Sequence, residues 1–179
     1  MFTRKSMDDL QRIAAAENQN APKFPLILIL DDVRSMQNVG SAFRTADAFA
    51  VTALYLCGYT PQPPHRDIHK TALGATETVT WKHFSGVAEA IAAARDEGYQ
   101  VVSVEQAHNS IGLNTAAAEF LERPTALIFG NEVSGVSDTA LAASDACIEI
   151  PQYGSKHSLN ITVSLGIVVW EFVRRKSIS

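Results

Sequence analysis

Short, almost uninterrupted apolar runs alternate with amphipathic stretches along most of this chain. The runs have the length of buried strands and end at polar or turn residues, a pattern typical of parallel sheets covered on both faces. Predicted strands occupy residues 26–30, 51–57, 100–104, 126–129 and 147–150. Apolar residues at helical spacing fill the intervals at residues 39–49, 87–97 and 137–143. The alternation predicts an α/β domain with a mostly parallel sheet and helices on both faces.

The N-terminal end of the chain is predicted to be a peripheral helix. Residues 6–18 begin with Ser6, and Asp9 stands three positions later, which makes a partial capping box. We therefore expect an N-terminal helical extension in residues 1–25 and a single domain in residues 26–179.

The last predicted helix, residues 159–175, is apolar around much of its circumference. Its apolar residues include Leu165, Ile167, Val169, Trp170, Phe172 and Val173. A single sheet contact cannot cover so wide a face, which predicts a second subunit and hence a homodimer formed through this helix. The alternative is a helix that packs wholly within its own chain, because wide apolar faces also occur in monomer cores.

Composition and charge narrow the class of protein. Of the 179 residues, 46% are apolar and 19% are charged, which excludes a disordered chain. The longest obvious apolar run, residues 26–30, is far shorter than the ~20 residues that cross a bilayer, and the N-terminus lacks a signal peptide's apolar core. We therefore expect no membrane association. A net charge of −4 excludes binding to nucleic acid through bulk positive charge, so such binding would need local basic patches.

The cysteines indicate the redox compartment. The two that are present, Cys57 and Cys147, are far apart in the sequence and form neither a disulfide framework nor a metal-binding spacing. Such a pair is typical of reduced thiols, which predicts a cytoplasmic protein.

Three segments combine glycine, asparagine, serine and charge at the ends of predicted strands: residues 31–46, 129–136 and 150–160. Ligands of open α/β sheets bind beyond the carboxyl ends of the strands. Neither GxGxxG nor GxxxxGK[ST] occurs in these segments, which weakens a dinucleotide-binding or P-loop interpretation. Simple structural roles remain open as well, because Asn38 and Ser158 could be helix N-caps and Glu132 a solvated turn residue.

Together, the three segments resemble the signature motifs of the SpoU/TrmH branch of the SPOUT RNA methyltransferases. Motif one is Asn38-Val39-Gly40 with Phe43-Arg44-Thr45-Ala46, motif two is Phe129-Gly130-Asn131-Glu132 with Gly135, and motif three is Ile150-Pro151, Gly154 and Ser158-Leu159-Asn160. Each motif is weak alone, but the ordered set covers about residues 26–175. Motif three departs from the family's pattern in having Gln152 where methionine is frequent.

The resemblance implies a fold and a cofactor. In this family the C-terminal part of the α/β domain forms a deep trefoil knot, and the knotted loops bind S-adenosyl-L-methionine. The residues expected to contact the cofactor are Val104, Phe129, Gly130, Ile150, Ser158 and Leu159, and Glu105 is a further candidate.

The reaction implied is methyl transfer to a ribose 2′-hydroxyl of RNA. Arg44 matches the arginine to which the family assigns activation of this hydroxyl. Either Arg44 orients the hydroxyl and stabilises developing oxyanion charge, or it acts as a literal base. The resemblance gives supporting roles in holding Arg44 and the ribose to Asn38, Glu132, Ser158 and Asn160. No metal is implied.

A basic segment, residues 65–70, completes the set of candidates. His65 and His69 have a spacing that zinc sites use on helices, but the neighbouring Arg66 and Lys70 would oppose a cation. We therefore expect an RNA-facing loop rather than a metal site. The predicted RNA-binding residues are Arg34, His65, Arg66, Lys70 and Lys156.

The expected substrate is tRNA. Relatives that act on rRNA often carry an additional N-terminal RNA-binding domain, and only about 25 residues precede the first predicted strand here. The alternatives are an rRNA 2′-O-methyltransferase and a non-catalytic RNA-binding module with the same fold.

Overall fold

A computed structural model describes residues 2–6, 9, 21–117, 122–155 and 158–176 of the chain. Within these residues it shows a seven-stranded sheet in the order β3-β2-β1-β6-β4-β7-β5, and every neighbouring pair is parallel. The strands are β1 (Phe24–Asp31), β2 (Val51–Cys57), β3 (Trp81–Phe84), β4 (Gln100–Val104), β5 (Ile111–Gly112), β6 (Thr125–Phe129) and β7 (Ala146–Glu149). The predicted parallel α/β sheet is confirmed.

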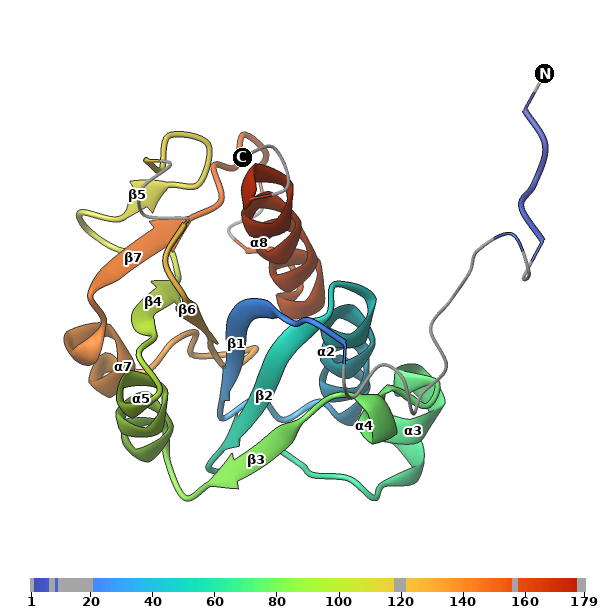
Figure 1. Cartoon of the computed structure of the whole chain (residues 1–179). Helices are drawn as coiled ribbons and strands as arrows, with labels where there is room; N and C mark the ends of the chain where they lie inside the picture. Colours follow the sequence, from blue (N-terminus) through green and yellow to red (C-terminus); the bar gives the residue numbers. More distant parts are fainter. Residues whose placement is uncertain (1, 7–8, 10–20, 118–121, 156–157, 177–179) are drawn as a thin grey trace.

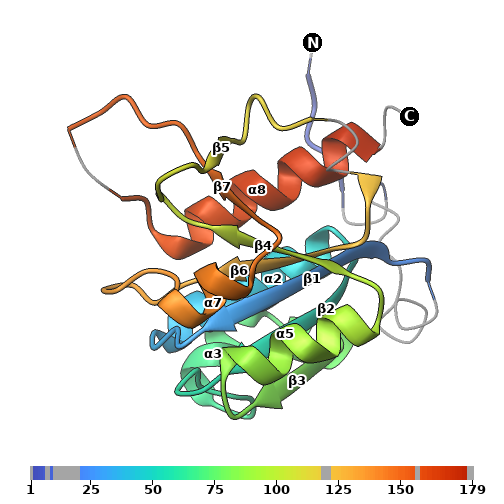
Figure 2. The same ribbon diagram turned by 90° about the vertical axis from the view of Figure 1, so that its left-hand side faces the viewer.

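Helices cover both faces of the sheet (Figures 1 and 2). On one side lie α2 (Met36–Ala48), α3 (Arg66–Ala72), α4 (Ala75–Thr78) and α8 (Ile161–Lys176), and on the other lie α5 (Val87–Asp96) and α7 (Asp138–Ala143). Successive side chains of a strand point to opposite faces, so Leu28 packs under α2 and α8 whereas Ile29 packs under α5. This two-sided burial explains why the strands read as continuous apolar runs.

The structure confirms the five predicted strands and the helices expected between them, with small shifts at their ends. Gly98 follows α5 at a φ of 86°, in the left-handed conformation that favours glycine after a helix, as its place in the sequence predicts. The sequence analysis did not predict the edge strands β3 and β5 or the short helices α3 and α4.

The interpretation of residues 65–70 as a loop was wrong, because Arg66–Ala72 form α3. The side chain of His65 caps this helix by accepting a hydrogen bond from the Asp67 amide at 3.2 Å. Its apolar side is buried against α2. The two helices approach so closely that a Cβ at Gly40 would overlap the carbonyl oxygen of Ile68, which explains the glycine of motif one.

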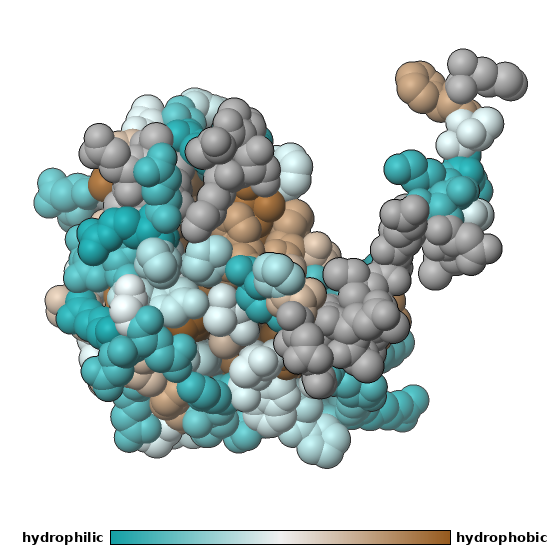
Figure 3. Space-filling model, viewed as in Figure 1, coloured by the Kyte–Doolittle hydropathy of each residue, from teal (hydrophilic) through white to brown (hydrophobic). Residues whose placement is uncertain are grey.

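The last helix, α8, is apolar on two sides. Leu165, Val168, Val169 and Phe172 are fully buried in the core beneath α8. The opposite side remains exposed, and apolar surface gathers over α8 in Figure 3. The exposed apolar residues of this helix are Val163, Ile167 and Trp170.

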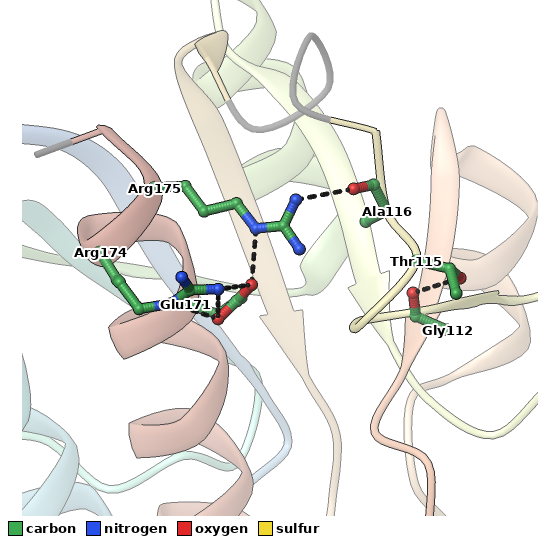
Figure 4. A network of polar contacts seen from close by, with 6 residues as sticks. All are labelled: Gly112, Thr115, Ala116, Glu171, Arg174 and Arg175. Carbon is green, nitrogen blue, oxygen red and sulfur yellow. Dashed lines mark hydrogen bonds and ion pairs between the residues drawn. The ribbon is translucent and has the colours of Figure 1, made fainter. Parts of the chain in front are cut away.

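A polar network fixes the end of α8 (Figure 4). The Glu171 carboxylate accepts hydrogen bonds from Arg174 at 2.7 Å and from Arg175 at 2.6 Å. Arg175 also donates to the carbonyl oxygen of Ala116 at 3.1 Å. This contact joins α8 to the segment that follows β5.

The structure describes only part of the predicted N-terminal helix. Ser6 and Asp9 exchange hydrogen bonds, with the Ser6 amide donating to the Asp9 carboxylate and the Asp9 amide donating to Ser6 Oγ, as a capping box requires. Most of the predicted helix 6–18 lies outside the described residues. The division into an extension and a domain stays a prediction, as does the trefoil knot.

Two further observations concern membranes and metals. Among the described residues, no helix is both long and apolar enough to cross a membrane. The same part of the chain contains no group of three or more histidine, cysteine, aspartate or glutamate side chains that could hold a metal ion.

Candidate active site

The segments that follow β4, β6 and β7 enclose a cavity of about 680 Å³ with the start of α8. Parallel strands end at the same edge of a sheet, so these segments converge there although they are far apart in the sequence. All six predicted cofactor-binding residues line the cavity: Val104, Phe129, Gly130, Ile150, Ser158 and Leu159. The structure thus brings the residues together, and their contact with a cofactor stays a prediction.

The loop of motif two forms one wall of the cavity and is closed on itself. Asn131 and Gly135 exchange two backbone hydrogen bonds, both 2.9 Å long. A Cβ at Gly130 would overlap the backbone of Gly135 and Val136, so only glycine fits at this position. Gly135 has a φ of 70°, which also favours glycine.

Glu105 supports the same loop from the end of β4. Its carboxylate accepts hydrogen bonds from the Val136 amide at 3.0 Å and from the Gln106 amide at 2.8 Å. The carboxylate lies where a Cβ of Gly135 would be, so the glycine lets the two segments meet. Glu105 therefore lines the cavity and shapes it.

Asn131 joins motif two to the segment that follows β1. Its side-chain amide donates to the carbonyl oxygen of Asp32 at 2.7 Å, and its side-chain oxygen accepts from the Val133 amide at 2.8 Å. Asn131 is buried, so these bonds also satisfy its polar atoms. The sequence analysis quoted this residue within motif two but gave it no role.

Glu132 links motif two to the start of α2. Its carboxylate accepts hydrogen bonds from the amides of Arg34 and Ser35, each at 3.1 Å, and from the Asn38 side chain at 2.7 Å. Asn38 in turn accepts a longer bond of 3.4 Å from the side chain of Asn160 in motif three. One chain of polar contacts therefore connects the three motifs.

These contacts set the ionisation of Glu132. Partial burial opposes the charged form, but the hydrogen bonds from the Arg34 amide, the Asn38 side chain and the Ser35 amide outweigh it. The pKa of Glu132 is consequently lowered from its ordinary value of 4.5. The carboxylate is therefore charged at neutral pH.

The helix caps differ from the simple alternatives raised by the sequence. Ser35, not Asn38, is the N-cap of α2, and its hydroxyl accepts a hydrogen bond from the Asn38 amide at 3.2 Å. Before α8 it is Asn160, not Ser158, whose side chain accepts from the amide of Thr162, at 2.9 Å. Asn38 is thereby free to bind Glu132.

Arg44 lies apart from the cavity of its own chain. It is exposed on α2 and is not among the lining residues. Arg44 is six residues beyond Asn38, which adds about 9 Å along a helix. Arg44 therefore does not line the cavity of its own chain, and its role in the reaction stays a prediction.

The predicted RNA-binding residues lie beyond β1 and β2. Arg34 follows β1, His65 is the N-cap of α3, and both Arg66 and Lys70 are exposed on that helix. Lys156 lies outside the described residues. Binding of RNA to these side chains stays a prediction.

The ion pairs within the described residues lie elsewhere. They join Lys82 to Glu97, Arg95 to Asp145, and Arg174 and Arg175 to Glu171. Exposed cations that make no ion pair within the described residues follow β1 and β2: Arg34, Arg66 and Lys70.

Comparison with known protein families supplies the remaining observation. The sequence model of the SpoU rRNA Methylase family matches residues 25–170, which is most of the chain. The protein belongs to the SpoU rRNA Methylase family.

Relatives of this SpoU-family protein are named for two classes of RNA. It is 31% identical over 170 residues to a 23S rRNA (guanosine-2′-O-)-methyltransferase RlmB of Nitrosomonas europaea, covering 94% of this chain and 64% of the relative. It is 30% identical over 152 residues to a tRNA (guanosine(18)-2′-O)-methyltransferase of Aquifex aeolicus, covering 84% and 70%. The chain thus spans slightly less than two thirds of the Nitrosomonas relative.

A solved structure supports the SpoU-family fold. The AdoMet-bound rRNA methyltransferase of Sinorhizobium meliloti matches with a TM-score of 0.78 and 27% sequence identity. The match covers 90% of this chain and 61% of that one. The parallel sheet and its flanking helices are therefore those of the family.

Replacing Glu132 of this SpoU-family domain by glutamine is expected to lower the free energy of unfolding at pH 7 by about 1–2 kcal/mol. Hydrogen bonds to a charged group contribute about 1.5–3 kcal/mol, and solvent screening reduces this for an exposed carboxylate. The lowered pKa gives stability that is present above pH 4.5 and is lost as the pH falls through the native pKa of Glu132. The difference between wild type and Glu132→Gln should therefore shrink in acid. Urea unfolding between pH 7 and pH 3 measures it.

The exposed Glu122 gives a matched control, because Glu122→Gln should leave the free energy of unfolding unchanged at every pH. A difference between wild type and Glu132→Gln that stays constant down to pH 3 would contradict the assigned role of the carboxylate.

Proposed function

We propose that this protein transfers a methyl group from S-adenosyl-L-methionine to a ribose 2′-hydroxyl of RNA. One observation carries the proposal. The six residues that match the family's cofactor positions line a single cavity, and Glu132 ties that cavity to the motif that holds Arg44. The volume of about 680 Å³ is that of a small-molecule site.

The lining suits the proposed cofactor. Its described residues include carboxylates and no lysine or arginine, which favours a ligand with positive charge. The carboxylates are Glu105, Glu132, Asp138 and Glu149. Backbone groups around Gly130 and aliphatic side chains such as Ile150 and Leu159 suit the edge and faces of an adenine ring. S-adenosyl-L-methionine supplies a methyl group already activated on a sulfonium sulfur.

The chain's own residues have to prepare the hydroxyl. A ribose 2′-hydroxyl is a poor nucleophile, so it needs alignment and a way to lose its proton. The Arg44 guanidinium can orient it with a neighbouring phosphate and stabilise the developing oxyanion. A literal general base at Arg44 is the alternative, although a guanidinium loses its proton only at very high pH.

The test incubates the protein with bulk tRNA and bulk rRNA and labelled S-adenosyl-L-methionine. Label should enter RNA and be recovered as 2′-O-methylnucleosides. Relatives named for rRNA and for tRNA both match at about 30% identity, so the test includes both RNA classes. We propose tRNA as the substrate, with rRNA as the alternative. RNA binding without transfer would support the non-catalytic module, and an absence of both transfer and cofactor binding would refute the enzyme.

We further propose that two chains associate through α8. Val163, Ile167 and Trp170 expose 49%, 40% and 53% of their surface, and they form an apolar side that the described part of the chain leaves open. A second cavity of about 350 Å³ lies beside Ile167 and Trp170. A partner chain would cover this side and could carry its Arg44 to a cavity that Arg44 does not reach in its own chain.

The dimer predicts a mass of twice 19.4 kDa by light scattering after size exclusion. Trp170→Glu should shift the protein to the monomer mass, because a buried unpaired carboxylate opposes association. Leu73→Glu, an equally polar change at the exposed leucine that follows α3, should leave the dimer intact. A wild-type monomer at micromolar concentration would refute the dimer, and a dimeric Trp170→Glu variant would place the interface elsewhere.

The location that we propose is the cytoplasm. Cys57 and Cys147 are both free thiols, and burial raises the pKa of each. They are therefore protonated at neutral pH, as suits structural cysteines in a reducing compartment.

A further inference from the structure

Tyr59 is a large aromatic residue that the fold leaves exposed. It follows β2 by two positions, and 81% of its surface is accessible. Its ring makes no hydrogen bond or ring contact within the described residues. A single exposed aromatic residue is not unusual, so the inference depends on how the fold holds it and on what surrounds it.

The backbone at Tyr59 is held firmly. Its amide donates a hydrogen bond to the Asp32 carboxylate at 2.8 Å, and the hydroxyl of the buried Thr60 donates to the carbonyl oxygen of Leu30 at 3.1 Å. The preceding Gly58 has a φ of 58°, and a Cβ there would overlap the Asp32 carboxylate. The turn is therefore built around Asp32 and presents the tyrosine from a fixed position.

Asp32 also connects this turn to the candidate active site. While its carboxylate accepts the Tyr59 amide, its carbonyl oxygen accepts the Asn131 side chain from the loop that lines the cavity. In the sheet, β2 is two strands away from β6, which carries that loop. Two strand spacings amount to about 10 Å, so the strand that leads to Tyr59 lies close to the strand that carries the cavity loop.

The surroundings of Tyr59 favour a polyanion. Arg34, which follows β1, and Arg66 and Lys70, on α3, are exposed and make no ion pair within the described residues. Figure 1 shows the segment from β2 to α3 running along the lower edge of the molecule. Arg34 is two residues beyond Asp32, whose carboxylate accepts the Tyr59 amide, and Arg66 is seven residues beyond Tyr59. An exposed aromatic ring combined with unpaired cations is the means by which proteins bind single-stranded nucleic acid.

We infer that Tyr59 is a stacking residue for RNA, and that its ring receives an unstacked base flanking the nucleotide whose ribose enters the site. This inference rests on the proposed function and adds to it the recognition of a single-stranded or looped region. Arg34, Arg66 and Lys70 hold the phosphates on either side. Stacking accepts any base, so Tyr59 contributes affinity and register rather than base identity.

The test measures binding of fluorescein-labelled bulk tRNA by anisotropy at several salt concentrations. Tyr59→Ala should weaken binding by about 5- to 150-fold, the range for loss of one stacked base, and Tyr59→Phe should bind like wild type. The loss should be the same at low and high salt, because stacking releases no counterions. Lys70→Ala, in contrast, should reduce the salt slope by about 1.

Control measurements distinguish a role of Tyr59 in RNA recognition from a role in folding or in the proposed reaction. Cofactor affinity and thermal unfolding of Tyr59→Ala should match wild type, and Phe2→Ala, which removes another exposed ring, should leave RNA binding unchanged. RNA binding that is unchanged in Tyr59→Ala, or an equal loss of RNA affinity in Tyr59→Ala and Tyr59→Phe, would overturn the inference. The proposed function would still stand if the wild-type protein transfers methyl groups to RNA. Wild-type protein that neither binds nor methylates RNA would overturn both.

Discussion

Replacing Arg44 by alanine is expected to lower methyl transfer to RNA by at least about 100-fold, the effect of losing one group that stabilises transition-state charge. Arg44 is exposed and does not line the cavity, and it makes no ion pair within the described residues. Its removal should therefore leave both cofactor affinity and the free energy of unfolding near wild type. Initial rates with bulk tRNA and rRNA, together with calorimetric titration of the cofactor, measure the two effects separately.

Two further variants sharpen this experiment. Arg44→Lys keeps the positive charge but loses the planar guanidinium group. Its rate of methyl transfer should therefore lie between those of wild type and Arg44→Ala. Arg123→Ala removes an exposed arginine just before β6, at the opposite end of the strands, and should transfer methyl groups at the wild-type rate. Wild-type turnover by Arg44→Ala on an RNA that the protein methylates would exclude the assigned role.

The second large effect is expected from Gly130→Ala, which should weaken cofactor binding by about 5- to 150-fold. A Cβ at Gly130 would overlap the backbone of Gly135 and Val136, and backbone cannot rotate away as a side chain can. The loop has to shift, and strain of about 1–3 kcal/mol from overpacking corresponds to that range of affinity. Calorimetric titration with S-adenosyl-L-methionine measures the loss.

The matched control is Gly86→Ala, because a Cβ at Gly86 meets no atom within 4 Å and the residue has an extended backbone. This variant should bind the cofactor like wild type. A cooperative thermal transition in Gly130→Ala shows that the domain still folds, so weaker binding reports on the cavity. Wild-type affinity in Gly130→Ala would mean that the loop does not form the cofactor site.

The parts of the fold that could be predicted from the sequence are those whose burial produces a recognisable pattern of apolar and polar residues. The strand β1 is apolar at every position from Leu26 to Leu30 because helices cover both of its faces. The edge strand β3 gives no such signal, since Lys82 and His83 are exposed at its centre. Helix α3 was missed because Ile68 and Ala72 are its only buried residues, too few for a visible periodicity.

The sequence indicated which residues belong to the candidate site but not how they are arranged in space. The motifs identified the cavity residues, whereas the contact between Glu132 and Asn38 joins positions 94 residues apart, which spacing along the chain does not reveal. Spacing also did not place Arg44, because the helix carries it away from the strand ends. The role of Ser35 as N-cap was open to prediction, since serine three residues before Asn38 is a common start of a helix.

The place of β6 in the middle of the sheet has a consequence for synthesis on the ribosome. One edge of β1 pairs with β2, which follows soon in the chain, but the other edge pairs with β6, which begins only at Thr125. Roughly 90 residues separate these strands, and their translation takes about 5 to 20 s at the usual 5 to 20 residues per second. During this interval the β1 edge presents unpaired backbone groups that invite wrong partners. Folding of the nascent chain is therefore gated by the emergence of β6, and the first half of the chain depends on the second for its central pairing.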